Sequence, residues 1–424
     1  MLAGLKFAVH RTIPSPVLNA YHFVLAILAA LIYGFPSRDI VVVGVTGTKG
    51  KSSTIEFLNA IFEAAGWKTA LASSIRFKIG EKSRPNLLRM TMAGRFALQR
   101  FLSKAGHAKC NIAFLEMTSE GARQHRHRGI SLNALIFTNL APEHIESHGS
   151  LEAYANAKFE LGKQLARSRK RPRYMVANAD DTQSPRYLTL PIEHALPFSL
   201  GAAGPFSTSE SGGSFRFEKT DIQISQPGEF SLRNALAAAT LARAMGIEIE
   251  AIARGLANVK NIPGRAERIE AGQDFIVVVD YAHTPDSLQA IYDAYPGHRR
   301  ICVLGSTGGG RDMWKRPVMG SIADATCDHV ILTNEDPYDE DPKTIVEGLA
   351  RGMTKQVPEI IMDRRVAIRA ALSLGKAGDA IIITGKGTDP CICGPRGSKN
   401  PWSDAGVARE EIQALRTATA SETR

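Results

Sequence analysis

Cysteine is scarce in this chain, with five residues among 424. So small and odd a number in a long chain argues against a disulfide framework and favours a reducing compartment. Cys391 and Cys393 form the one close pair, and no second pair completes the set of about four ligands that a structural metal site requires. We therefore expect ordinary thiols, with neither a disulfide-built fold nor a zinc site.

The sequence also lacks an apolar run long enough to cross a bilayer. The longest run, residues 23–35, spans about 20 Å as a helix, against about 30 Å for a hydrocarbon core. No small-residue cleavage site follows it, which argues against a signal peptide. Because the run is apolar on all sides, three placements stay open: a helix docked on the protein, contact with a membrane surface through residues 17–35, or a true span.

Dense blocks of one charge are missing too. The formal net charge of +10 comes from Lys and Arg residues that are scattered, with the densest patch at residues 167–173. Scattered cations argue against a nucleic-acid partner, and phosphates on small substrates account for the excess equally well. No internal repeat is evident.

Two series of short β-branched runs alternate with helical stretches, which is typical of parallel α/β sheets. Pro263-Gly264 separates the two series, so we predict α/β architecture: an apolar helical segment over 1–37, a P-loop-type central domain with a mostly parallel sheet over 38–262, and a Rossmann-like α/β domain over 263–424. The expected strands are 39–45, 111–117, 133–139 and 173–179, then 275–281, 300–306, 329–334 and 379–385. Helical stretches are expected over 53–65 and 230–258, with loops and β excursions over 200–215.

A glycine-rich turn follows the first expected strand. Gly44, Gly47 and Gly50 precede Lys51 and Ser52, in the order that a phosphate-binding strand–turn–helix requires. Backbone N–H groups would surround phosphate oxygens, Lys51 would contact the β- and γ-phosphates, and Ser52 would lie near Mg²⁺. Five residues, not four, separate Gly44 from Gly50, so the turn is not a strict Walker A motif.

The string TGTKGKSST resembles the variant P-loop of the Mur ligases and folylpolyglutamate synthetases. The resemblance extends from about residue 38 to about residue 412. DYAHTPD at 280–286 and RDMWKRPVMG at 311–320 favour the tripeptide synthetase branch of the Mur ligases. The resemblance implies an ATP- and Mg²⁺-dependent ligase that forms an amide bond.

The resemblance assigns roles residue by residue. Glu116 would coordinate Mg²⁺, Lys158 would be carbamylated to bind a second Mg²⁺, and Ser231 replaces one expected adenine-contacting Asn. The implied metal ligands are Ser52, Glu116, His144 and Lys158. The implied nucleotide contacts are Gly47, Thr48, Gly50, Lys51, Ser52, Ser53, Asn139, Asn234, Arg265 and Asp280. The implied catalytic set is Lys51, Glu116, His144, Lys158, Arg265 and Lys315.

Substrate selectivity departs from the family pattern. Relatives that add diaminopimelate read Asp-Asn-Pro-Arg where this chain has residues 335–338, and a tyrosine there cannot form the charged fork that grips a carboxylate. The acidic pair Glu335 and Asp336 would suit an amine, so diaminopimelate, lysine or a similar amino acid stays open. The implied substrate contacts are Arg311, Lys315, Glu335, Asp336, Tyr338, Gly385 and Asp389. Arg316 is a further candidate to hold phosphate or the acyl substrate.

The implied reaction joins the D-glutamyl carboxylate of a nucleotide-sugar dipeptide to an amino acid through an acyl phosphate. This branch carries a uridine-binding domain ahead of the P-loop, whereas about 40 residues precede it here. Three alternatives remain: a ligase or amidase subunit acting on a lipid-linked precursor, a folylpolyglutamate synthetase, or a non-catalytic nucleotide-binding scaffold. We expect a cytoplasmic monomer, and a peripheral contact of the apolar helix at the inner face of the membrane stays one of the open placements.

Overall fold

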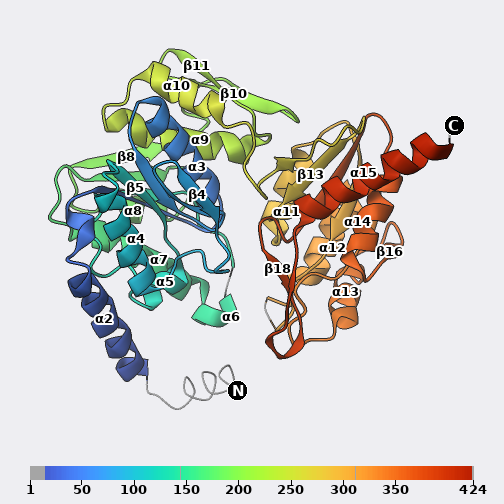
Figure 1. Ribbon diagram of the computed structural model, residues 1–424, viewed down its shortest axis with the longest axis horizontal. Helices are drawn as coiled ribbons and strands as arrows, with labels where there is room; N and C mark the ends of the chain where they lie inside the picture. The colour runs from blue at the N-terminus through green and yellow to red at the C-terminus, as the bar shows by residue number, and fades with distance from the viewer. Residues whose placement is uncertain (1–14, 144, 311, 423–424) are drawn as a thin grey trace. The chain divides into compact units, whose positions relative to one another are not determined.

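The computed structural model describes residues 15–143, 145–310 and 312–422 (Figure 1). His144 and Arg311, two of the expected site residues, therefore lie outside the described residues. The chain divides into two compact units. Unit 1 holds the described residues of Met1–Phe206 with Ser214–Ile224 and Phe230–Val259, and unit 2 holds Ser207–Gly213, Ser225–Glu229 and the described residues of Lys260–Arg424.

Unit 1 is built on an eight-stranded sheet in the order β4-β3-β2-β5-β1-β6-β7-β8. Strands β2, β5, β1, β6, β7 and β8, which are neighbours in this order, run parallel. Strands β3 and β4 continue the sheet beyond β2 as an antiparallel edge. The apolar residues of the central strands β2, β5 and β6 are buried, as expected for strands with helices on both faces. The strands are β1 (Val41–Thr46), β2 (Thr69–Ala72), β3 (Arg76–Ile79), β4 (Lys82–Pro85), β5 (Ile112–Glu116), β6 (Ala134–Phe137), β7 (Tyr174–Asn178) and β8 (His194–Phe198).

The described helices of unit 1 are α2 (Ser15–Ile32), η1 (Pro36–Arg38), α3 (Lys51–Ala64), α4 (Arg95–His107), α5 (Ser119–Arg123), α6 (Ile145–His148), α7 (Leu151–Ala166), α8 (Ser184–Leu188), α9 (Glu229–Ala244) and α10 (Ile249–Asn258). A separate three-stranded sheet follows β8 along the chain, in the order β11-β10-β9. Its strands are β9 (Phe206–Ser209), β10 (Gly212–Phe217) and β11 (Thr220–Ile224). The loops and β excursions expected over 200–215 are the start of this sheet.

Unit 2 contains a six-stranded sheet in the order β12-β13-β17-β14-β15-β16, parallel except for β12. Its strands are β12 (Glu267–Arg268), β13 (Ile276–Asp280), β14 (Arg299–Leu304), β15 (His329–Leu332), β16 (Glu359–Ile360) and β17 (Asp379–Thr384), and a small hairpin adds β18 (Cys391–Cys393) and β19 (Lys399–Pro401). Its helices are α11 (Pro285–Asp293), α12 (Lys315–Thr326), α13 (Pro342–Ala350), α14 (Arg364–Ser373), η2 (Pro395–Gly397) and α15 (Asp404–Glu422).

The predicted α/β class is confirmed, and each expected strand coincides with an observed one to within about two residues. The edge strands β3 and β4 were missed. β4 reads Lys-Ser-Arg-Pro and all four residues are exposed, so it carries no apolar pattern from which a strand can be predicted.

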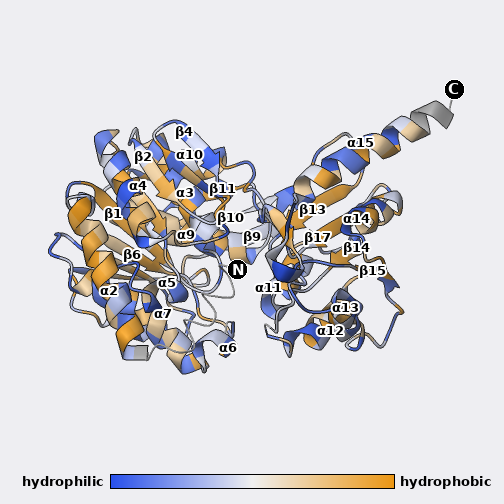
Figure 2. Ribbon diagram, turned by 60° about the horizontal axis from the view of Figure 1, so that its bottom comes forward, coloured by the Kyte–Doolittle hydropathy of each residue, from blue (hydrophilic) through white to orange (hydrophobic). Residues whose placement is uncertain are grey.

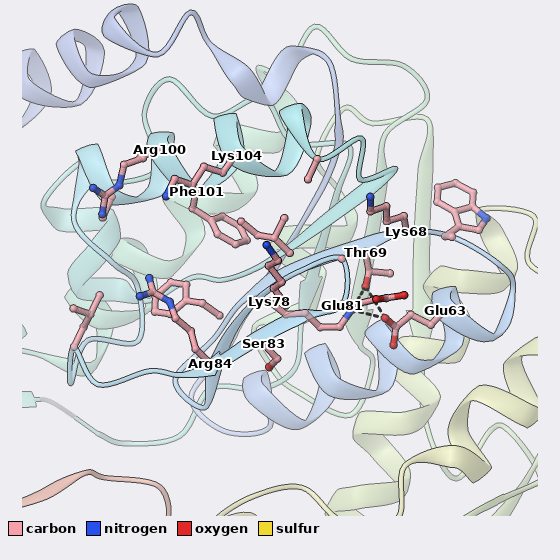
Figure 3. A pocket seen from close by; sticks show the side chains of 18 of the residues that line it. Glu63, Lys68, Thr69, Lys78, Glu81, Ser83, Arg84, Arg100, Phe101 and Lys104 are labelled. Carbon is pink, nitrogen blue, oxygen red and sulfur yellow. Dashed lines mark hydrogen bonds and ion pairs between the residues drawn. The ribbon is translucent and has the colours of Figure 1, made fainter.

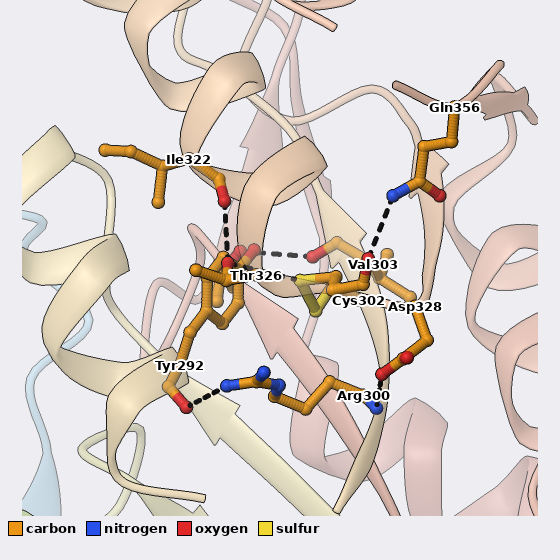
Figure 4. The surroundings of a disulfide bond; sticks show 10 residues. Tyr292, Arg300, Cys302, Val303, Ile322, Thr326, Asp328 and Gln356 are labelled. Carbon is orange, nitrogen blue, oxygen red and sulfur yellow. Dashed lines mark hydrogen bonds between the residues drawn. A yellow bond between two sulfur atoms is a disulfide. The ribbon is translucent and has the colours of Figure 1, made fainter. Parts of the chain in front are cut away.

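The expectation of five free thiols was wrong for one pair. Cys302 and Cys327 form a disulfide, with 6.2 Å between their Cα atoms (Figure 4). Cys302 lies on β14, and Cys327 ends α12 just before the neighbouring parallel strand β15. The right-handed return of a β-α-β unit brings these positions together, although 25 residues separate them in the sequence. Cys110, Cys391 and Cys393 are buried and form no disulfide among the described residues.

The apolar N-terminal run is confirmed as a helix, α2, that is docked on unit 1. Ala26, Ala29 and Ala30 are buried. A Cβ atom placed on Gly129 would lie 2.5 Å from the Ala30 side chain, so the helix approaches closely only because this residue is glycine. Within the described part of the chain, no helix is both long and apolar enough to cross a membrane.

Candidate active site

The glycine-rich turn joins β1 to α3 and has no room for side chains at two positions. Gly47 has φ +144° and Gly50 has φ +81°, a region of backbone conformation that favours glycine. A Cβ atom on Gly47 would lie 2.0 Å from Thr138 Oγ1, and one on Gly50 would lie 2.1 Å from Asn234 Oδ1. Side chains from the residue after β6 and from α9 therefore pack directly against the backbone of the turn.

Asn139 holds this turn in shape. Its carbonyl accepts the Thr48 N–H at 2.9 Å, and its side-chain Oδ1 accepts the Lys49 N–H at 2.9 Å. Thr138 Oγ1 donates to the Lys49 carbonyl at 2.6 Å. The expected nucleotide-pocket residue Asn139 thus acts on the backbone of the phosphate-binding turn.

The N-terminus of α3 is suited to an anion. Its cap residue is Gly50, which offers no side-chain hydrogen bond, and the first N–H groups of any α-helix have no intrahelical acceptor. With the helix dipole, these groups favour a bound phosphate. Lys51 Nζ donates to the carbonyls of Gly47 at 3.1 Å and Thr48 at 2.8 Å, which places a cation at the same turn.

Glu116 ends β5, and it pairs in register with Val45 of β1. The side chain is 3% exposed. Its Oε2 atom accepts the Ser52 hydroxyl at 3.0 Å and the Ser74 N–H at 2.7 Å. The structure thereby brings together Ser52 and Glu116, two of the four expected metal ligands.

Sequence reasoning missed Ser74, which follows the carboxyl end of β2, and Thr91. The Ser74 hydroxyl donates to Thr91 Oγ1 at 2.9 Å while the Ser74 N–H holds Glu116. Polar residues directly after the strand at 69–72 were the available signal, because ligand groups gather at the carboxyl ends of parallel strands. That strand itself was not predicted.

The oxygen donors here fit Mg²⁺, which prefers carboxylate and hydroxyl ligands. Among the described residues, no group of three or more His, Cys, Asp or Glu side chains is placed to hold a metal ion. Of the predicted metal ligands, Ser52 and Glu116 lie in hydrogen-bond contact and could offer oxygen atoms to a metal ion. His144, another predicted ligand, lies outside the described residues.

Lys158 lies on α7 and is 2% exposed. Its Nζ atom donates to the Gly47 carbonyl at 2.7 Å and lies 4.5 Å from the centre of the Tyr154 ring. Burial, and then the neighbouring charge of Lys51, lower the pKa of Lys158 well below its ordinary value. Both influences disfavour the charged form of this amine, which lies at the same turn as Lys51.

In unit 2, Arg265 and Asp280 form a second cluster. The Arg265 guanidinium lies 4.5 Å from the centre of the Tyr281 ring and donates to the Gly264 carbonyl at 2.8 Å. Asp280, the last residue of β13, accepts N–H groups from Ala266 and Ala282, each at 2.6 Å. Burial raises the pKa of Asp280 above its ordinary value.

Glu335 and Asp336, the two acidic residues after β15, lie in different environments. Asp336 accepts from Lys386 Nζ at 2.8 Å and from the Cys393 N–H at 2.7 Å, so its carboxylate is already engaged. Glu335 is 3% exposed, and its Oε1 accepts the Thr307 hydroxyl at 2.7 Å. Among the residues that the structure describes, none donates a hydrogen bond to Glu335 Oε2. Asp336 is thus already paired with a buried lysine from the loop after β17, and its contact with an incoming amine stays a prediction.

The loop after β17 lies against Glu335. Gly385 has φ +108°, and a Cβ atom there would lie 2.2 Å from Glu335 Oε2. Lys386 is also paired with Asp389, at 3.3 Å. Burial is the largest influence on Lys386 and lowers its pKa, but Asp389 and Asp336 together outweigh it, so the pKa is raised. Lys386 is therefore a fixed cation beside Glu335.

Two cations that are adjacent in the sequence, Lys315 and Arg316, begin α12. Lys315, its first residue, is 4% exposed. Arg316 forms a two-point ion pair with Glu340, at 2.6 and 2.9 Å, and also donates to the Thr307 carbonyl. The expectation that Arg316 holds substrate is wrong, because its guanidinium is buried and joined to Glu340. Tyr338 donates its N–H to the Cys393 carbonyl at 3.0 Å.

Comparison with known proteins gives two family matches. The Mur ligase middle domain matches residues 45–242, and the Mur ligase glutamate ligase domain matches residues 264–387. Both stretches contain the clusters described above.

Relatives similar to the chain carry consistent names. A UDP-N-acetylmuramoyl-L-alanyl-D-glutamate--2,6-diaminopimelate ligase of Syntrophomonas wolfei is 36% identical, covering 86% of this chain and 76% of that protein. A UDP-N-acetylmuramyl-tripeptide synthetase of Roseiflexus is 35% identical, covering 95% and 85%. A solved structure of a UDP-N-acetylmuramoyl-L-alanyl-D-glutamate--2,6-diaminopimelate ligase is 26% identical with a TM-score of 0.60, covering 89% and 79%. The Mycobacterium tuberculosis folylpolyglutamate synthase shares the fold alone, at 17% identity with a TM-score of 0.72, covering 91% and 94%.

Proposed function

The chain belongs to the Mur ligase family, and from this premise we propose that it is an ATP-dependent ligase of peptidoglycan precursor synthesis. Its acyl substrate is a UDP-N-acetylmuramoyl-L-alanyl-D-glutamate, the substrate class in the names of its relatives. The single observation that carries the proposal is the cluster at the glycine-rich turn, where Lys51, Glu116 and Lys158 surround a helix N-terminus.

The proposed reaction has two steps. In the first, an oxygen of the D-glutamyl carboxylate attacks the γ-phosphorus of ATP, which forms an acyl phosphate and releases ADP. In the second, the amine of the incoming amino acid attacks the acyl carbon and loses a proton, and phosphate leaves. Lys51, Arg265 and Lys315 stabilise the negative charge that develops on the transferred group.

We propose that Ser52 and Glu116 hold Mg²⁺ with His144, and that Mg²⁺ when bound offsets the charge of the phosphates. The lowered pKa of Lys158 supports its carbamylation, because only the neutral amine adds CO₂. The resulting carbamate is an anionic oxygen ligand beside Gly47 and Lys51.

We further propose that Glu335 selects the incoming amino acid. Its Oε2 is buried and lies next to Gly385, and a buried carboxylate oxygen is stabilised by a cationic amine. Tyr338 supplies no charge for a distal carboxylate. Lysine or a similar diamine is therefore the expected substrate, in preference to diaminopimelate.

The setting that we propose is the cytoplasm, with the protein as a monomer and residues 17–35 at the inner face of the membrane. The exposed apolar side chains of α2 support contact with a membrane surface.

The deciding experiment is ATP-dependent phosphate release with UDP-N-acetylmuramoyl-L-alanyl-D-glutamate and a panel of amino acids that includes lysine and diaminopimelate. Release that depends on one amino acid is the expected result. Glu335→Gln should then lower kcat/KM for the preferred diamine by roughly 10- to 100-fold, the value of a hydrogen bond to a charged group. Phosphate release that is absent with every amino acid contradicts the proposed function, and release with diaminopimelate alone contradicts the role of Glu335.

A further inference from the structure

Several large apolar side chains of α2 are exposed although the helix is docked on unit 1. Ala29 and Ala30 are fully buried and Leu25 and Ile27 are partly buried, while Val24 is 60% exposed. A docked helix ordinarily buries its large apolar side chains and leaves small or polar ones outside. The large exposed side chains of this helix are Val17, Tyr21, Phe23, Val24, Leu28, Leu31 and Ile32.

Most of these side chains form one stripe. Positions 17, 21, 24, 28 and 31 recur at alternating spacings of four and three residues, which places them on one face of a helix. No Asp, Glu, Lys or Arg occurs within α2, so no charge interrupts the stripe (Figure 2). A contiguous apolar surface of this kind marks a binding face.

A cationic pocket lies on the far flank of the neighbouring helix. α4 packs against α2, and its residues Arg100, Phe101 and Lys104 line one wall of a cavity of 1460 Å³ (Figure 3). The opposite wall comes from β3 and β4. Six cations and two acids line the cavity: Lys68, Lys78, Lys82, Arg84, Arg100 and Lys104 against Glu63 and Glu81. Lys78 pairs with Glu63, so the remaining side chains keep an excess of positive charge.

Apolar side chains connect the stripe and the pocket. Phe77 and Phe101 lie inside the pocket with their ring centres 6.1 Å apart. Leu88 also lines the pocket and is half exposed, and Phe96 is exposed on α4, the helix between the pocket and α2. Unit 1 therefore carries an apolar stripe on α2 and a cationic pocket on the far flank of α4, and the sequence 1–38 contains no Asp or Glu.

We propose that this face of unit 1 binds a membrane of anionic phospholipids. The α2 stripe enters the boundary between headgroups and acyl chains, and the cations of the pocket bind lipid phosphates. A second copy of the chain is the less suitable occupant, because paired helices in water carry charged residues beside their apolar seam and α2 has none. This binding rests on the membrane contact proposed above for residues 17–35 and adds its lipid chemistry and a second group of residues. Its test requires no turnover, so its failure would leave the ligase reaction untouched.

The experiment is co-sedimentation of the full chain with vesicles of phosphatidylcholine alone or with about 30% phosphatidylglycerol. Binding to the anionic vesicles is expected, and it should weaken between about 0.1 M and about 0.5 M NaCl. Val24→Asp with Leu28→Asp should weaken binding by at least about tenfold, because two apolar side chains leave the lipid boundary. Arg100→Glu with Lys104→Glu should have a similar effect through lost attraction to phosphate.

Two double variants serve as matched controls. Val357→Asp with Val366→Asp changes two exposed valines of unit 2, and Lys376→Glu with Lys399→Glu makes the same change in net charge there. Both should bind vesicles as the unchanged chain does. Absent binding to anionic vesicles, or binding that survives the α2 substitutions, overturns the proposal. A dimer in light scattering that Val24→Asp with Leu28→Asp converts to a monomer, without vesicle binding, identifies a second copy as the occupant and overturns it as well.

Discussion

At the scale of single residues, Lys51 and Glu116 are charged groups held at one turn by backbone and hydroxyl partners. Neither contributes to the apolar core, so replacing them removes charge from the site more than it weakens the fold. We predict that Lys51→Ala, Glu116→Ala and His144→Ala each lower turnover by at least about 10². Phosphate release measures the effect, and the exposed Lys219→Ala should leave it unchanged. Near-normal turnover in all three variants contradicts the site assignment.

Lys158 provides a pH-dependent test that is separate from turnover. Its pKa is lowered in the folded chain, so over the range between the folded and the unfolded pKa the unfolded chain binds more protons. The contribution of Lys158 to the free energy of unfolding therefore rises with pH across that range. Relative to Lys158→Met, the unchanged chain should gain stability as the pH rises toward the ordinary lysine pKa, as measured by urea unfolding. A difference that is constant or falls with pH would show that the amine is not desolvated.

At the scale of elements, the β1–α3 connection depends on glycine at Gly50. Gly50→Ala places a Cβ atom 2.1 Å from Asn234 Oδ1, so the turn or α9 must move. We expect ATP binding, measured by calorimetry, to weaken by at least about 10².

Gly246 is the matched control for this substitution. It has a similar φ of +86° but nothing within 4 Å of a Cβ atom. Gly246→Ala should therefore show the backbone strain alone, of about 1 kcal/mol, with ATP binding intact. Equal effects of the two substitutions contradict the assignment of the steric contact.

At the scale of the whole molecule, one buried ion pair joins distant parts of unit 2. Arg364 begins α14 and forms a two-point pair with Asp404, the first residue of α15, at 2.6 and 2.8 Å. Arg364 also donates to the Thr384 carbonyl at the end of β17 at 2.7 Å. Both side chains of the pair are about 99% buried or more. Arg364→Met should lower the free energy of unfolding by about 3–5 kcal/mol, because Asp404 keeps a buried charge without its partner.

The control for this prediction is an exposed pair in the same unit. Lys343 lies 4.0 Å from Glu347 with both side chains largely exposed, so Lys343→Met should change the free energy of unfolding by less than about 1 kcal/mol. Guanidinium unfolding followed by circular dichroism measures both. Equal changes for the two variants would contradict the role of burial.

The elements that were predictable share a local cause. β1, β13 and β17 are rich in β-branched residues and β5 is a continuous apolar run up to Glu116, and such runs are typical of strands buried on both faces of a parallel sheet. The glycine spacing before Lys51 predicts a tight strand-to-helix turn for a similar reason, since glycine permits the positive φ angles there, although residues distant in sequence such as Asn139 also hold the turn. β4 was missed because its polar, exposed residues take their conformation from pairing with β3.

The sequence by itself determined the class of fold, the phosphate-binding turn and the position of Glu116 at the end of its strand, because periodicity and glycine act over a few residues. Only the tertiary structure decided which carboxylate of the pair Glu335 and Asp336 keeps an open oxygen, since Lys386 reaches Asp336 across 50 residues of sequence. It also decided that α2 buries Ala26, Ala29 and Ala30 and leaves Val17, Val24 and Leu31 exposed. An all-apolar helix has no preferred face until another surface packs against it, so this orientation is a property of the folded chain alone.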